Sequence, residues 1–120
     1  MLLPLYHPLH VAEMGATIDI VSKGRLILGV GQGYRPEEFG GFGVSLSNRG
    51  RLLEENVKII RALWTKDKVS FQGKFHELKD VTLSPKPVQK PSPPIWVAAK
   101  SEAAVRRAAR LCDAYFMDPV

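Results

Sequence analysis

The apolar run at residues 25–30 constrains the fold more than any other stretch of the chain. The sequence RLILGV has a single charge, and the glycine-containing segment GQGYR follows it at residues 31–35. An apolar strand without polar alternation is typical of a parallel sheet that is covered on both faces. Because ligands of α/β folds bind at the carboxyl ends of strands, this segment predicts a site for a small organic molecule. A glycine turn with a purely structural role is the alternative, since GxGxG is a weak motif.

Strand and helix patterns alternate along the rest of the chain. Strands are predicted at residues 1–5, 25–30, 95–99 and 114–117. Helices are predicted at residues 8–21, from a Ser47 or Ser45 cap to residue 64, and from the Ser101 cap to about residue 111. A short helical turn is predicted to begin at Pro36. A β-hairpin is predicted at residues 68–78, followed by an extended strap with five prolines between residues 85 and 94.

This order predicts an α/β fold built from parallel βαβ units. Four such strands are too few to close an eight-stranded barrel. The simplest interpretation is a single domain segment, residues 1–120, of a partial (β/α)8 TIM barrel with a β-hairpin insertion.

Periodicity also predicts which side chains face the core. The inward positions are Val11, Met14 or Gly15, Ile18 and Val21 in the first helix; Leu53, Val57, Ile60 and Trp64 in the second; and Ala104, Ala108 and Leu111 in the third. Three arginines, Arg106, Arg107 and Arg110, are expected to face outward. Trp96 is expected in the core, and Asp19 is expected to pair with Arg25. Asp113 is expected in a turn or cap.

Charge and composition exclude several functions. The formal charge is +5, but the 17 basic residues are scattered among acidic ones, so nucleic-acid binding is not favoured. No apolar run approaches the roughly 20 residues of a membrane span. The single cysteine, Cys112, forms no internal disulfide and no cysteine-based zinc site, which fits a cytoplasmic protein. The three histidines are dispersed in the sequence, and no metal site is predicted.

Short motifs in a fixed order resemble the bacterial luciferase-like flavin-dependent monooxygenases and their F420-dependent relatives. The matching pieces are Leu3-Pro4-Leu5, His7-Pro8, Ala12-Glu13, residues 18–25, residues 28–34, Glu38-Phe39, Phe42-Gly43, Arg49, Leu53-Glu54-Glu55, Leu63-Trp64, Gly73-Lys74-Phe75, residues 85–89, residues 93–97, Ala108-Ala109 and Asp113. Each piece is weak alone, and their order over almost the whole chain makes the match specific.

The resemblance implies a (β/α)8 barrel of which this chain spans about the third to the sixth strand. It implies an oxidoreductase that uses reduced FMN and O2 to oxygenate a small organic substrate, with a flavin reductase as a partner. An F420-dependent hydride transfer is the alternative cofactor chemistry. A truncated, non-catalytic half-barrel that self-associates into a homo-oligomer through its strand edges is the alternative of another class.

The resemblance also assigns roles to single residues. Cofactor contacts are implied for Gln32, Gly33, Tyr34, Glu37, Lys100, Ser101 and Glu102, and catalytic positions for His7 and Tyr34. Tyr34 stands where some F420 members hold a catalytic acid, and its phenol favours stacking or hydrogen bonding instead. Three residues have an alternative structural role: His7 as a helix cap, which is preferred, Glu37 as a helix-start carboxylate, and Ser101 as an N-cap.

Overall fold

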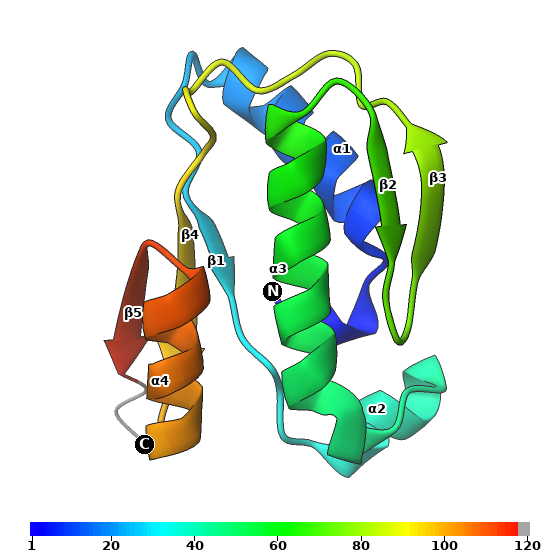
Figure 1. The fold of residues 1–120 in the computed structure, drawn as a ribbon. Coiled ribbons are helices and arrows are strands. Elements are labelled where there is room, and N and C mark those ends of the chain that lie inside the picture. Colours follow the sequence, from blue (N-terminus) through cyan, green and yellow to red (C-terminus); the bar gives the residue numbers. More distant parts are fainter. Residues whose placement is uncertain (118–120) are drawn as a thin grey trace.

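The structure, a computed structural model, describes residues 1–117 and contains one parallel sheet, a separate hairpin and a layer of helices (Figure 1). The sheet has the order β1 (Leu28–Val30), β4 (Ile95–Ala99), β5 (Ala114–Met117), and all its pairings are parallel. The helices are α1 (Pro8–Val21), α2 (Pro36–Phe42), α3 (Arg49–Thr65) and α4 (Glu102–Leu111). The predicted α/β class, the parallel pairing and the strands of residues 95–99 and 114–117 are confirmed.

The helices α1, α3 and α4 lie on one side of the sheet. Figure 1 shows α3 standing between the sheet and the hairpin of β2 (Val69–Gln72) and β3 (Glu77–Val81). The hairpin is antiparallel, as predicted, and its turn spans residues 73–76. The proline-rich strap carries the chain from β3 back to β4. The hairpin therefore packs on the outer side of the helical layer, away from the parallel sheet.

The core lies between α1, α3 and the helix-facing side of the sheet. The four positions predicted to line α3 are all buried, as are Ile95 and Val97 of β4. Trp64 is 1% exposed and donates its indole N–H to the Ala12 carbonyl at 3.0 Å, so its polar atom is satisfied. This bond and the surrounding apolar contacts fix α1 against α3.

The inward face of α1 differs from the prediction. Val11 and Gly15 are buried as expected, but Ile18 is 51% and Val21 78% exposed. Helix α1 instead buries a stripe of small residues that includes Ala12 and Ala16. A Cβ on Gly15 would lie 2.7 Å from Cζ2 of Trp64, so the close approach of the tryptophan selects small residues over the larger apolar ones.

The N-terminal strand predicted at residues 1–5 is wrong in its extent. Only Leu2 forms a parallel bridge with Gly31, and Leu3–Leu5 is a 3₁₀ helix. The Leu3 amide donates to the Gly31 carbonyl at 3.1 Å, and pairing stops at Pro4, which has no N–H. The chain then turns into α1, whose N-cap is His7.

The sheet is covered on one face, not on both as the apolar run at residues 25–30 predicts. Gly29 and Trp96 pair in register on the face opposite the helices, and Trp96 is 40% exposed. Ile27 and Phe116 are also about half exposed. The prediction that Trp96 is a core residue is therefore wrong for this chain. We call this surface of Ile27, Gly29, Trp96, Ala98 and Phe116 the open face.

Asp19 is fully buried, but its partner is not Arg25 as predicted. Its carboxylate accepts hydrogen bonds from the Leu26 amide (3.2 Å), the Gln89 amide (2.9 Å) and the Gln89 side chain (2.8 Å). Burial raises the pKa of this carboxyl, but the hydrogen bonds from Gln89 and Leu26 outweigh it and hold the pKa below its ordinary value. Asp19 therefore ties α1 to the start of β1 and to the proline-rich strap.

The expected serine cap of α3 is also wrong. Residues Leu46–Asn48 form a 3₁₀ helix, and Asn48 is the N-cap without a side-chain hydrogen bond. The hydroxyls of Ser45 and Ser47 bond to each other at 2.8 Å. The chain thus reaches α3 through an extra turn. We call residues 43–52, which include this turn and the start of α3, the α2–α3 ridge; it lies between two clefts that are described below.

Candidate functional site

A cleft of about 330 Å³ opens at the carboxyl ends of β1 and β4. Its lining includes five of the residues that the sequence assigns to a cofactor: Gln32, Gly33, Tyr34, Lys100 and Ser101. The glycine at 33 is required, because its φ is 82° and a Cβ there would lie 2.9 Å from the Phe39 ring. The structure therefore brings together two segments that are almost 70 residues apart in the sequence.

A second hollow of about 350 Å³ adjoins this cleft and carries the positive charge. The two share Gln32, Arg49 and Ser101, and the hollow adds Arg51 and Arg107. We call the two together the basic cleft. Within the described residues, Arg49 and Arg51 make no ion pair and no side-chain hydrogen bond, so their guanidinium groups are available to an anion.

Arg107 is half-buried, contrary to the prediction that it faces outward. Its side chain is 22% exposed and lies against Gly50, where a Cβ would meet the guanidinium at 2.9 Å. Its Nε is buried and has no hydrogen-bond partner in the described part of the chain, and the nearest charge is Glu54 Oε2 at 3.8 Å. A buried donor without a partner marks a place that an external acceptor would complete.

The N-terminus of α4 points its backbone into the same cleft. The Ser101 side chain accepts a hydrogen bond from the Ala104 amide at 3.1 Å, which confirms Ser101 as the N-cap. The first amides of a helix and its dipole favour a negative group. Three arginines, a serine and a helix N-terminus around one hollow thus fit a phosphate, and the glycine segment beside them leaves room for a flat ring.

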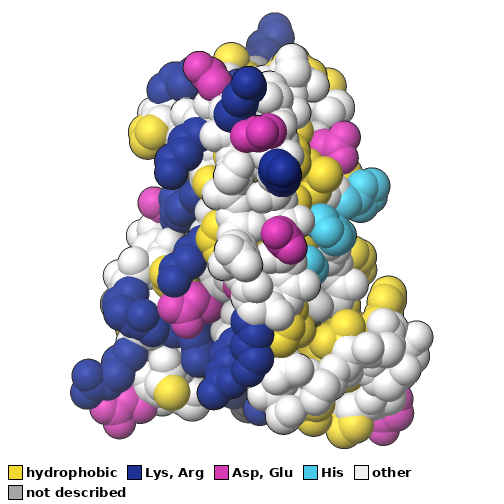
Figure 2. All heavy atoms as spheres, turned by 45° about the vertical axis from the view of Figure 1, so that its right-hand side comes forward, with side chains coloured by type: hydrophobic (Ala, Val, Ile, Leu, Met, Phe, Trp, Pro, Cys, Tyr) yellow, Lys and Arg dark blue, Asp and Glu magenta, His cyan; other side chains and the backbone are white. Residues whose placement is uncertain are grey.

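Charge elsewhere on this side of the molecule is balanced by acids. Figure 2 shows Lys and Arg side chains along one side of the view with Asp and Glu side chains between them, and the histidines on the other side. Glu54 pairs with Lys58 (3.5 Å) and Arg110 (3.6 Å) in addition to Arg107. The basic cleft is therefore distinguished by two arginines, Arg49 and Arg51, that have no such carboxylate partner among the described residues.

Three predicted site residues lie outside the basic cleft. Glu37 is in the first turn of α2 and lies 4.0 Å from Arg35, which fits its helix-start alternative. Glu102 pairs with Arg106 at 2.8 Å on the exposed side of α4. His7 caps α1, since its Nδ1 accepts from the Leu9 amide at 3.2 Å, and it lines a different cleft. The preferred structural role of His7 is thus present in the structure.

Comparison with known proteins identifies the family of the chain. The sequence model of luciferase-like monooxygenases matches residues 1–120. The chain belongs to the luciferase-like monooxygenase family.

Relatives within the luciferase-like family use two cofactors. The chain is 37% identical over 114 residues to an FMNH2-dependent dimethylsulfone monooxygenase of Pseudomonas putida, covering 92% of this chain and 31% of the relative. It is 35% identical over 112 residues to an F420-dependent glucose-6-phosphate dehydrogenase of Amycolatopsis mediterranei, covering 92% and 33%. Both the FMN and the F420 alternatives thus occur among its relatives.

Solved luciferase-like structures share the fold. The monooxygenase RslO1 of Streptomyces bottropensis superposes with a TM-score of 0.84 at 38% identity, over 90% of this chain and 33% of that one. This chain therefore spans about one third of the length of the relatives it matches. The predicted span from the third to the sixth barrel strand stays a prediction.

Two classes of feature are not found among the described residues. No three His, Cys, Asp or Glu side chains in residues 1–117 gather as a metal site would require. In the same part of the chain, no helix has both the length and the apolar character that a membrane crossing demands.

The sequence missed the arginines of the basic cleft. Arg49 is part of the motif that carries the family resemblance, but no role follows from the motif itself. Arg107 sits on the face of α4 that packs towards α3, and only the contact between these helices reveals it. The sequence signal that could have indicated an anion site is the pair Arg49 and Arg51 at the start of a helix. A cation there is disfavoured by the helix dipole, and a bound anion would offset this effect.

Proposed function

We propose that this chain supplies the phosphate-binding wall of a reduced-FMN site in an oxidoreductase that oxygenates a small organic substrate. The observation that carries the proposal is the basic cleft, in which the unpaired Arg49 and Arg51, the half-buried Arg107 and the α4 N-terminus meet the segment Gln32–Tyr34. Arginine suits phosphate because its planar fork forms paired hydrogen bonds.

Each group has a distinct task in this proposal. Arg49, Arg107 and the Ser101 hydroxyl hold the phosphate, and Gln32 with the Gly33 backbone orients the ring. Tyr34 is 74% exposed at the mouth, where its phenol can stack on the ring or donate a hydrogen bond to substrate. When bound, the reduced flavin supplies the electrons that activate O2. A flavin reductase is the partner that would deliver it.

Binding of reduced FMN to the Arg49→Ala variant tests the proposal. We expect the dissociation constant to rise about 10- to 100-fold, since hydrogen bonds to charged groups contribute about 1.5–3 kcal/mol. The measurement is anaerobic titration followed by flavin fluorescence. Riboflavin, which lacks the phosphate, should bind Arg49→Ala and the unmodified chain equally.

The matched control is Arg106→Ala, because Arg106 pairs with Glu102 on the outer side of α4, away from the basic cleft. It should bind reduced FMN as the unmodified chain does. Equal affinity of Arg49→Ala and the unmodified chain for reduced FMN would contradict the phosphate assignment. A parallel titration with reduced F420 decides between cofactors, and we expect FMN to bind more tightly because residue 34 is a phenol rather than an acid.

We also propose that the chain associates with a second copy through the open face. This face exposes Trp96, Phe116 and Ile27, each 40–49% exposed, on a sheet whose other side packs against the helices. Burial of such side chains is the main favourable term in protein association. Sedimentation velocity should show a dimer, and a monomer at all concentrations would contradict it.

A further inference from the structure

A cleft without lysine, arginine or carboxylate lies on the other side of the α2–α3 ridge from the basic cleft. Its volume is about 380 Å³. Its walls come from residues 4–7, from residues 43–45 of the ridge and from the hairpin turn. The apolar lining includes Leu5, Val44, Leu52 and Phe75. We call it the neutral cleft.

The polar groups of the neutral cleft are few, and two of them lack partners. The Nε2 of His76 is buried and has no hydrogen-bond partner within residues 1–117. The Asn48 side chain makes no capping hydrogen bond to α3. His7 stands beside His76 with ring centroids 4.8 Å apart, and its Nδ1 is already used as the α1 cap. A buried polar atom without a partner calls for an external hydrogen-bonding group.

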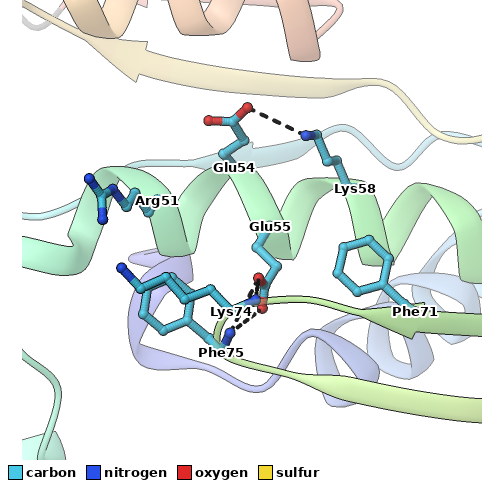
Figure 3. A pocket seen from close by; sticks show the side chains of 7 residues that line it. All are labelled: Arg51, Glu54, Glu55, Lys58, Phe71, Lys74 and Phe75. Carbon is cyan, nitrogen blue, oxygen red and sulfur yellow. Dashed lines mark hydrogen bonds and ion pairs between the residues drawn. The ribbon is translucent and has the colours of Figure 1, made fainter.

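The turn that carries His76 is held rigidly. Glu55 of α3 points its carboxylate at the hairpin turn (Figure 3) and accepts hydrogen bonds from the amides of Lys74 (2.7 Å), Phe75 (3.0 Å) and His76 (2.8 Å). A Cβ on Gly73 would clash with this carboxylate, so the turn fits it closely. His76, which lines the cleft, thereby has a fixed backbone, and this lowers the entropic cost of binding.

We propose that the neutral cleft binds a small uncharged organic molecule with an apolar body and a carbonyl oxygen, which accepts a hydrogen bond from His76 Nε2. The absence of charged side chains from the lining disfavours an anion or a cation, because a charge would lose its hydration without gaining a partner. The apolar walls take the body of the ligand, and His76 with Asn48 supplies donors for one oxygen. This site is separate from the basic cleft and does not rest on the function proposed above.

Acetophenone is a suitable probe because it combines an apolar ring with one carbonyl. We expect a titration of the ¹⁵N-labelled chain to give saturable shifts at the amides of Val44, Ser45 and His76, with a dissociation constant of about 1 mM. Benzoate, of similar size but charged, should bind at least about fivefold more weakly.

Two variants locate the interaction. His76→Phe keeps an aromatic ring and removes the donor, so its dissociation constant should rise about fivefold, the effect of losing one neutral hydrogen bond. Val44→Trp fills the cleft and should abolish saturable shifts, while circular dichroism verifies the fold. His10→Phe, a change of the same kind at an exposed position of α1 outside the cleft, should leave binding unchanged.

Three outcomes would overturn the site. These are shifts confined to the open face, equal affinity of His76→Phe and the unmodified chain, and displacement of acetophenone by FMN. Because Arg49 lies in the basic cleft, Arg49→Ala should bind acetophenone normally even if it has lost FMN. Loss of acetophenone binding in Arg49→Ala would place the probe in the basic cleft and refute the neutral cleft.

Discussion

Asp19 shows how one buried carboxylate can join three segments of the chain. It receives hydrogen bonds from Leu26, just before β1, and from Gln89 in the strap, which also donates to the Leu26 carbonyl at 2.8 Å. A buried charge is tolerated only when donors surround it, and here backbone and side-chain donors do so. The sequence motif that contains Asp19 did not reveal this, because Arg25 is nearer in the chain than Gln89.

Replacing Asp19 by Asn should destabilise the fold by about 2 kcal/mol, because a neutral amide weakens charge-assisted hydrogen bonds and turns an N–H₂ group towards other donors. Urea unfolding followed by circular dichroism measures the change. Asp67→Asn, at an exposed position after α3, should stay within about 0.5 kcal/mol of the unmodified chain. A loss of similar size in both variants would contradict the role of Asp19.

His76 should make the stability of the chain sensitive to mild acid. Burial and the neighbouring His7 hold the pKa of His76 below its ordinary value of 6.5, although Glu55 opposes them. The unfolded chain therefore takes up this proton at a higher pH than the folded chain, so stability is complete above pH 6.5 and falls as the pH drops below it.

The free energy of unfolding should thus be lower at about pH 5.5 than at about pH 7.5. His76→Phe should show a smaller difference between these two conditions, whereas the exposed His10→Phe should keep the difference of the unmodified chain. An unchanged difference in His76→Phe would assign the sensitivity to other groups. The pKa values of Asp19 and Asp113 are also lowered, and their contribution is lost only at more acidic pH, below their ordinary value of 3.8.

At the level of elements, the starts of α1 and α4 and the strands β4 and β5 were predictable, whereas the cap of α3 and the N-terminal strand were not. Pro8, Ser101 and the wholly apolar β4 define their elements locally, so the sequence is sufficient there. The inward face of α1 depends instead on how closely Trp64 approaches, which is a property of the helix pair. Likewise Gln32–Tyr34 and Ser101 were predictable from a glycine segment and a helix start, whereas Arg107 required knowing where α3 lies.

The α1–α3 contact predicts opposite effects for two glycine-to-alanine changes. Gly15→Ala should destabilise by about 1–3 kcal/mol, because its Cβ would overlap the Trp64 ring and overpacking outweighs the gain of about 1 kcal/mol in helix propensity. Gly41→Ala in α2 has no atom within 4 Å of its Cβ and should stabilise by up to about 1 kcal/mol. Thermal unfolding compares them, and stabilisation by Gly15→Ala would refute the close contact.

For the whole molecule, the two sides of the sheet have opposite character. One side packs against the helices and carries the buried Val30, Ile95 and Val97, while the open face leaves aromatic rings in contact with solvent. The apolar sequence of the strands predicted that both faces of the sheet are covered. The relatives that the chain matches are about three times as long. The sequence therefore carries the pattern of a two-sided sheet although only one side is covered within this chain.

Trp96→Lys should weaken self-association by placing a charge in the middle of the open face. We expect the dimer dissociation constant to rise by at least about 10-fold, since removing a central aromatic commonly costs more than about 1 kcal/mol. Val21→Lys makes the same kind of change at the exposed end of α1 and should leave association unaltered. Sedimentation equilibrium measures both, and a dimer unchanged by Trp96→Lys would place the interface elsewhere.

The two tryptophans of the chain give it a built-in pair of optical reporters. Trp64 is sealed between α1 and α3 with its N–H bonded, so its fluorescence should be blue-shifted and shielded from iodide. Trp96 lies on the open face, so in the monomer its emission should be red-shifted and readily quenched, and dimerisation should reduce both effects. The fluorescence of Trp64 can thus report folding of the helical layer, and that of Trp96 can report covering of the sheet. Both can be followed in one sample without an added label.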